Sequence, residues 1–291
     1  MVDPTIVPSR SEFLALARTG KLVPVYRDVF ADHDTPVSAF RKIDEGDYSF
    51  LLESVEGGEK WGRFSLLGSR PSRVFIARGD RCELHEGGKV TPLARHPLEE
   101  LADLLSQSQA VALPGLPRFC GGAVGYLGYD AVRWFERLPS NAKDELGLPD
   151  AVFMFGDVVS VFDNLTHTMK VVTHARGGDS PDHAYDSAVA KINAEVDRLR
   201  RPLGWVDPPR APGEAGSGET GEPSSTTPKE SFMKAVETAK EHIRAGDIFQ
   251  VVLSHRMSAA VSQPPFEGYR ALRVTNPSPY MYFLKLGPVS I

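Results

Sequence analysis

Short apolar runs separated by glycine-containing turns constrain the fold of this chain more than any other feature. In the first pair of runs, a turn connects Tyr48–Val55 to Gly62–Gly68. In the second pair, a turn connects Ser72–Arg78 to Arg81–Glu86. Runs of this length, rich in aliphatic and aromatic residues and bounded by glycine, are typical of β-hairpins. Hairpin strands are antiparallel neighbours, so these runs favour an antiparallel sheet over a regular succession of βαβ units.

Helix signals lie between these strands. Ser9 and Glu12 form a capping-box pattern at the start of a helix predicted over Arg10–Thr19, and Gly20 is a natural stop. Further helices are predicted after Thr35-Pro36, at Pro97–Leu105 and at Ser180–Arg200, and two more strands at Asp150–Asp163 and Thr168–Ala175. The mixture predicts an α+β fold of layered antiparallel sheets with flanking helices.

A stretch from Pro208 to Pro228 interrupts this pattern. It consists mostly of Pro, Gly, Ser and Thr and holds no large apolar residue. Such a composition indicates a solvated linker or a mobile insertion, although a long loop inside one domain is the alternative. We predict an N-terminal unit at 1–205, a linker or insertion at 206–228, and the start of a second domain at 229–291.

Regular secondary structure is predicted to begin again directly after this stretch. Thr227 is the expected N-cap of a helix that ends at Gly246, followed by a strand at Asp247–Met257, a helix at Pro264–Val274 and a strand at Tyr280–Leu286. The apolar run Val289–Ile291 is too short to cover the strand before it. We therefore expect the sequence to be a fragment, with its second unit incomplete.

Composition narrows the class of partner. The 291 residues carry a formal net charge of −5, and no Lys/Arg block is long enough to predict a nucleic-acid or membrane surface. Cys82 and Cys120 are far apart and match no metal or redox spacing. Without a signal-peptide pattern or an apolar stretch of membrane-spanning length, we expect a cytoplasmic protein.

The segment "NPSPYMYF" (Asn276–Phe283) is unusually rigid for its length. Each proline lacks an N–H and disfavours the helical conformation of the residue before it. The segment is therefore predicted to be a stiff turn that leads into a strand. A rigid turn can hold backbone groups ready for a small polar ligand at low ordering cost.

Four motifs in order give the chain a family resemblance. "LLES", "GRFSLLG", "GDIFQVVLSHR" and "RVTNPSPYMYF" together resemble the large subunit of anthranilate synthase, component I, from about Val23 to Ile291. The resemblance implies conversion of chorismate and ammonia to anthranilate and pyruvate in tryptophan biosynthesis, with Mg²⁺ as cofactor. It also implies feedback binding of L-tryptophan and a glutamine amidotransferase partner, component II, that supplies the ammonia.

The resemblance further implies a tryptophan-binding site at Leu52, Glu53, Ser54, Pro279, Tyr280 and Met281. Ser54 would hydrogen-bond the amino-acid head, Glu53 would offset its ammonium, and Met281 would take the indole. The alternatives are purely structural roles: an ordinary strand end at Glu53-Ser54, and packing of Met281 in the core. Because Ser54 precedes the linker and Tyr280 follows it, the ligand is expected to bridge two units.

The catalytic residues are expected elsewhere. By the resemblance, the metal carboxylates, the catalytic histidine and the chorismate-binding motifs lie beyond residue 291, so we predict that this chain alone is inactive. Two rival interpretations remain: the large subunit of aminodeoxychorismate synthase and a non-catalytic tryptophan-binding module. Binding of tryptophan without turnover would favour the module.

A glycine-rich segment, Cys120–Asp130, invites a nucleotide-binding interpretation. Gly122, Gly125 and Gly128 do not match G-x-G-x-x-G, and no βαβ unit surrounds them. A tight strand crossing, where only glycine fits, is the better explanation.

Overall fold

The computed structural model describes residues 5–54, 62–139, 143–204 and 223–291. The contacts within the chain divide it into two compact units. The first unit combines Met1–Val206 with Asn276–Ile291, and the second unit is Asp207–Thr275. The last sixteen residues thus pack with the first unit, although they follow the second along the chain. Most of the predicted linker, like the turn after Ser54, lies outside the described residues.

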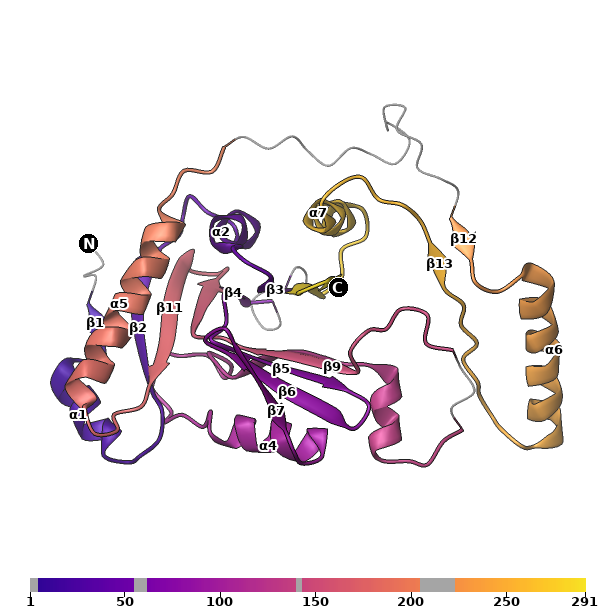
Figure 1. The fold of residues 1–291 in the computed structure, drawn as a ribbon. Coiled ribbons are helices and arrows are strands. Elements are labelled where there is room, and N and C mark those ends of the chain that lie inside the picture. Colours follow the sequence, from indigo (N-terminus) through magenta and orange to yellow (C-terminus); the bar gives the residue numbers. More distant parts are fainter. Residues whose placement is uncertain (1–4, 55–61, 140–142, 205–222) are drawn as a thin grey trace. The chain divides into compact units, whose positions relative to one another are not determined.

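The first unit is built on an eight-stranded antiparallel sheet with the order β1-β2-β11-β10-β4-β3-β14-β15 (Figure 1). Its strands are β1 (Ile6–Val7), β2 (Val23–Phe30), β3 (Tyr48–Ser54), β4 (Phe64–Ser69), β10 (Val158–Asp163), β11 (Thr168–Ala175), β14 (Tyr280–Leu286) and β15 (Val289–Ser290). The predicted pairing of the first two apolar runs is confirmed, since Leu51 lies opposite Leu67.

A second antiparallel sheet in the same unit has the order β7-β6-β5-β9-β8. Its strands are β5 (Arg73–Arg78), β6 (Arg81–Glu86), β7 (Lys89–Leu93), β8 (Ala123–Leu127) and β9 (Ala151–Phe155), and the 3-10 helix η1 (Tyr129–Trp134) follows β8. The second predicted hairpin is confirmed by the pairing of Arg78 with Arg81. The fold is therefore α+β with antiparallel sheets, as the sequence predicts.

The predicted strand over Asp150–Asp163 is two strands. The chain breaks at Gly156 and Asp157, so that β9 belongs to the five-stranded sheet and β10 to the eight-stranded one. The hydroxyl of Thr173 donates to the carbonyl of Asp157 at 2.7 Å, which satisfies a backbone group at the break. The predicted run Asp150–Asp163 thus passes from the five-stranded sheet into the eight-stranded one.

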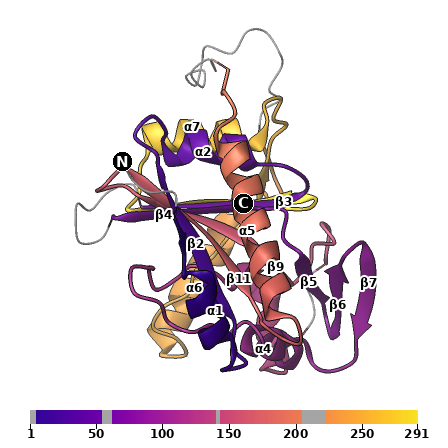
Figure 2. The same cartoon turned by 90° about the vertical axis from the view of Figure 1, so that its left-hand side faces the viewer.

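Helices cover the sheets with their apolar faces. Helix α2 (Pro36–Ile43) buries Ala39, Phe40 and Ile43, and the ring of Phe40 meets that of Phe283 on β14 with centroids 5.9 Å apart. Helix α5 (Pro181–Leu199) packs along β11 and β2 (Figure 2). Leu101 and Leu104 of α4 (Pro97–Ser106) join a core cluster with Phe75 and Phe155 of the smaller sheet.

In the first unit, the observed helix ends agree with the capping signals in the sequence. Helix α1 (Arg10–Ala17) begins with the predicted capping box: the Ser9 hydroxyl accepts from the Glu12 N–H, and the Glu12 carboxylate accepts from the Ser9 N–H at 2.8 Å. The long helix α5 lies within one residue of its predicted bounds. Among the described residues, no helix is long and apolar enough to cross a bilayer.

The second unit contains α6 (Lys229–Ala245), α7 (Pro265–Thr275) and the short pair β12 (Ser224–Ser225) and β13 (Met257–Ser258). The N-cap of α6 is Pro228 and not the predicted Thr227, while Gly246 ends the helix at φ 82° as expected. The strand predicted over Asp247–Met257 is wrong: only Met257 pairs, opposite Ser225. Apolar composition favours a strand, but the strand forms only where a partner is present.

Candidate functional site

Pairing of β3 with β14 brings the predicted tryptophan-site residues together. In this register Ser54 lies opposite Tyr280, Glu53 opposite Met281 and Leu52 opposite Tyr282. Pro279 directly precedes the strand. Both strands belong to the same compact unit, so a ligand on these residues does not bridge two units, contrary to our expectation.

The alternation of the strands divides these residues between two faces of the sheet. Directly opposite residues in an antiparallel pair share a face, and neighbours along a strand do not. Ser54 and Tyr280 therefore share one face, where the Tyr280 side chain is 63% exposed. Glu53 and Met281 point to the other face and are 4% and 7% exposed. The side chain of Met281 thus points away from the face that carries Ser54.

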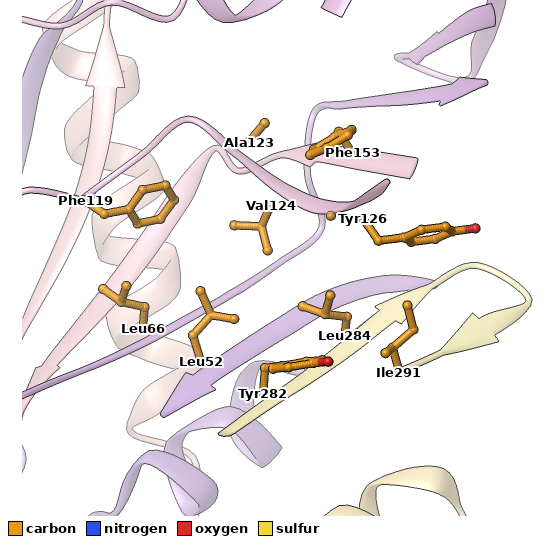
Figure 3. A pocket seen from close by; sticks show the side chains of 11 residues that line it. Leu52, Leu66, Phe119, Ala123, Val124, Tyr126, Phe153, Tyr282, Leu284 and Ile291 are labelled. Carbon is orange, nitrogen blue, oxygen red and sulfur yellow. The ribbon is translucent and has the colours of Figure 1, made fainter. Parts of the chain in front are cut away.

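A cavity of about 570 Å³ lies on the Ser54 face, between the two sheets (Figure 3). The larger sheet contributes Leu52, Leu66, Tyr282 and Leu284 to its lining; the remaining lining residues are Phe119, Ala123, Val124, Gly125, Tyr126, Phe153 and Ile291. The hydroxyl of Tyr126 is engaged, since it donates to the carbonyl of Pro149 at 2.7 Å. The cavity is therefore mostly apolar, of a size found in small-molecule sites.

The sequence patterns did not mark most of these lining residues as functional. Leu66, Phe119, Val124 and Phe153 are ordinary apolar positions of strands or of the segment before β8. Their signal in the sequence is the same as that of core residues such as Leu67 or Val152. Only the packing of one sheet against the other distinguishes the residues that line the cavity from those that fill the core.

The wall formed by β8 depends on a close approach of backbones. A Cβ atom at Gly125 would lie 1.8 Å from the carbonyl oxygen of Val152 and 2.8 Å from the Cα of Phe153. Only glycine fits here, as predicted, but the two strands do not cross: β8 and β9 are paired neighbours in one sheet, with Gly125 opposite Phe153. Val124 and Tyr126, on either side of Gly125, line the cavity.

A half-buried histidine, His174 on β11, lies next to the segment that precedes β8. A Cβ at Gly121 would come within 2.3 Å of the His174 ring, and the His174 Nε2 is 4.0 Å from the Cys120 Sγ. Burial lowers the pKa of His174 to about 4 and raises the pKa of the Cys120 thiol. Both groups are therefore uncharged at neutral pH, which suits a packing role.

Polar contacts fix the start of β3 against β14. The hydroxyl of Ser49 donates to Asp44 at 2.8 Å, and the Lys285 Nζ lies 3.4 Å from the same carboxylate oxygen. Ser49 is fully buried and lies opposite Lys285 in the register. These contacts support the register that sets Ser54 opposite Tyr280.

The arrangement offers a place for a small molecule on one face of the larger sheet. Among the described residues, no three His, Cys, Asp or Glu side chains gather in a way that could hold a metal ion. What the site offers is an apolar cavity on the sheet face that also carries the half-buried Ser54 and the exposed Tyr280, although neither of these two residues lines the cavity. A small molecule with a polar head and an apolar body matches those properties.

Comparisons with known proteins agree with the motif resemblance. Residues 48–291 match the sequence profile of a family described as chorismate binding enzyme. Anthranilate synthase component 1 of Acetivibrio thermocellus is 40% identical over 283 residues, which cover 96% of this chain and 57% of the relative. The Thermus thermophilus protein of the same name is 41% identical over 279 residues, 91% of this chain and 54% of the relative.

A solved structure extends the likeness to the fold. Anthranilate synthase component I from Streptococcus pneumoniae TIGR4 superposes with a TM-score of 0.60 at 31% identity, covering 78% of this chain and 50% of that one. The chain thus spans little more than half the length of the relatives it matches. Since the family profile covers most of its residues, the chain belongs to the chorismate-binding enzyme family.

Proposed function

We propose that this chain is part of an anthranilate synthase component I, which converts chorismate and ammonia to anthranilate and pyruvate in tryptophan biosynthesis. The observation that carries this proposal is the 40% identity to such a component over 96% of the chain. The ordered motifs, the family match and the similarity of fold support the same assignment.

Within that enzyme, we assign to this chain the binding of L-tryptophan as a feedback effector. The support is the β3–β14 register, which sets Ser54 opposite Tyr280 beside an apolar cavity. The Ser54 hydroxyl would hydrogen-bond the amino-acid head, and the cavity would receive the indole. The cavity lining and not the Met281 side chain would take the indole, because that side chain is buried on the other face.

The chemical step is assigned to residues outside this chain. The resemblance attributes the Mg²⁺ ligands and the catalytic histidine to the part of the longer enzymes that follows the matched region. The described side chains offer no fitting set of metal ligands. On the strength of that resemblance, we propose that the chain alone does not turn over chorismate. We also propose that ammonia comes from glutamine through a component II partner.

A chimera tests the enzymatic assignment. The chain replaces the matching part of the Acetivibrio thermocellus relative, and anthranilate fluorescence is followed with chorismate, Mg²⁺ and ammonium. We expect anthranilate from the chimera and none from the 291-residue chain. A chimera that melts cooperatively but forms no anthranilate, or forms an aminodeoxychorismate product instead, would refute the assignment.

A further inference from the structure

Helix α5 carries a buried carboxyl group near its C-terminal end. Glu195 is 3% exposed and lies on the side of the helix that also buries Val196 and Leu199. Its Oε2 accepts a hydrogen bond at 2.8 Å from the Nη1 of Arg198, three residues further along the helix. A carboxyl group buried in this way is costly to ionise unless its charge is fully compensated.

The Arg198 guanidinium is shared with a second carboxylate. Its buried Nε lies 3.4 Å from the Oε2 of Glu45, in the turn between α2 and β3, but forms no hydrogen bond within the described part of the chain. Glu45 also meets Arg201, just beyond α5, at 2.7 Å and Arg70, just beyond β4, at 3.3 Å. These contacts fasten the end of α5 to the turn.

The two carboxyl groups lie in opposite electrostatic environments. Burial raises the pKa of Glu195 above its ordinary value of 4.5, and the hydrogen bond from Arg198 opposes this rise. The hydrogen bond from Arg201 lowers the pKa of Glu45 below the same value. As the pH rises, Glu45 therefore ionises first, and Glu195 ionises later, close to a carboxylate that is already charged.

Other charged side chains next to this part of α5 have partners of their own. Arg27, which β2 directs toward the helix, donates to Asn193 at 3.1 Å. Lys42 of α2 is bound to Asp34 at 2.8 Å. The residues of β10 and β11 on the helix side of the sheet are uncharged. The charges that act on Glu195 are therefore those that gather around the α2–β3 turn.

We propose that Glu195, Arg198 and Glu45 form a proton-controlled latch on the C-terminal end of α5. While Glu195 is protonated, the Arg198 charge belongs to Glu45 and holds the helix end to the turn. When Glu195 ionises, it competes with Glu45 for Arg198, and its charge gains hydration whenever the helix end opens. The latch therefore weakens as the pH rises, independently of tryptophan binding and of chorismate chemistry.

The latch controls the length of one connection between the units. Helix α5 is the last element of the first unit before the stretch that is rich in Pro, Gly, Ser and Thr. Each residue freed from the helix end is added to the chain that leads to α6. That chain is therefore shorter at low pH and longer once Glu195 is ionised.

Native-state hydrogen exchange of the 291-residue chain tests the latch. Protection factors of the amides at 196–201, corrected for intrinsic exchange, are measured between about pH 4.5 and 8. Opening that releases one proton becomes up to about tenfold more frequent for each pH unit while Glu195 titrates. We expect the wild-type protection to fall over that interval and to level off above it.

Two variants separate the latch from a general effect of pH. Glu195→Gln cannot ionise and should keep the low-pH protection at every pH. Asp197→Asn is the matched control on the exposed side of the same helix end, and its protection should fall as in the wild type. Protection that does not depend on pH in the wild type, or an equal fall in Glu195→Gln, would overturn the latch.

Glu45→Gln tests the competition for Arg198. Without the rival carboxylate, Arg198 compensates Glu195 alone, so Glu195 should ionise at a lower pH than in the wild type. Carbon NMR of labelled glutamate carboxyl groups follows this titration directly. A midpoint that stays unchanged or rises would overturn the competition between the two carboxylates.

Discussion

Ser54 and His174 illustrate how differently single residues contribute to the first unit. Ser54 ends a strand, is half-buried and faces the cavity side of the sheet. His174 lies beside Cys120 and Gly121, where burial lowers its pKa to about 4. In the proposed site the first residue would hydrogen-bond the ligand, while the second is tolerated because it is neutral.

Replacing Ser54 should weaken tryptophan binding. Loss of a hydrogen bond to a charged amino-acid head costs roughly 1.5–3 kcal/mol, so Ser54→Ala should weaken the affinity by at least about tenfold. Isothermal titration calorimetry measures it, with Ser187→Ala on the exposed side of α5 as control. Unchanged affinity in Ser54→Ala would remove Ser54 from the site.

His174 should make stability depend on pH. Its folded pKa of about 4 lies below the unfolded value of 6.5, so the unfolded state binds more protons between these pH values. The free energy of unfolding should therefore rise as the pH increases from 4 to 6.5, by up to about 3 kcal/mol.

Urea unfolding at several pH values, compared with His174→Gln, isolates this contribution. The variant should show a flatter pH profile over the same interval, since the other titrating groups are shared. Identical profiles in both proteins would mean that His174 is solvated in the folded state.

At the scale of elements, contacts between strands matter more than strand propensities. β8 and β9 approach so closely at Gly125 that no side chain fits, and this approach positions one wall of the cavity. In contrast, Asp247–Met257 has strand-forming residues but pairs only at Met257. Contacts between elements therefore decide where local preference is realised.

Gly125→Ala should be strongly destabilising. The new Cβ would meet the backbone of Val152, which cannot move aside as a flexible side chain can. We expect a loss of about 3 kcal/mol or more, at the upper end of overpacking costs, measured by urea unfolding. Gly204→Ala, where a Cβ meets nothing within 4 Å, should change stability little. Equal effects of the two substitutions would contradict the close approach of β8 and β9.

The whole molecule combines units that differ greatly in burial. The first has two sheets with extensive cores, whereas α6 of the second has no buried residue. Segments with few buried apolar contacts open at low free energy. The difference predicts unequal local stability along one chain.

Amides of α6 should exchange much faster than those of β11. Val171 and Val172 are fully buried, so β11 is expected to open only with the sheet. Native-state hydrogen exchange with mass spectrometry checks this. Comparable protection of α6 and β11 would show that α6 is packed against other residues in solution.

The sequence by itself determined the local elements and the family. Glycine turns predicted both hairpins, Ser9 and Glu12 predicted a capping box, and the ordered motifs identified the relatives. These features depend on contacts within a few residues, or on inherited residue identities, so they can be read from the linear chain. The same reading named the residues that β3 and β14 bring together.

Only the tertiary structure decided how those elements are used. It set the register that separates Ser54 from Met281 on opposite faces, and it split the run at Gly156 between two sheets. It also formed the cavity from residues as distant as Leu66 and Phe153. The physical reason is that strand register and sheet-to-sheet packing depend on partners far along the chain, which local patterns do not specify.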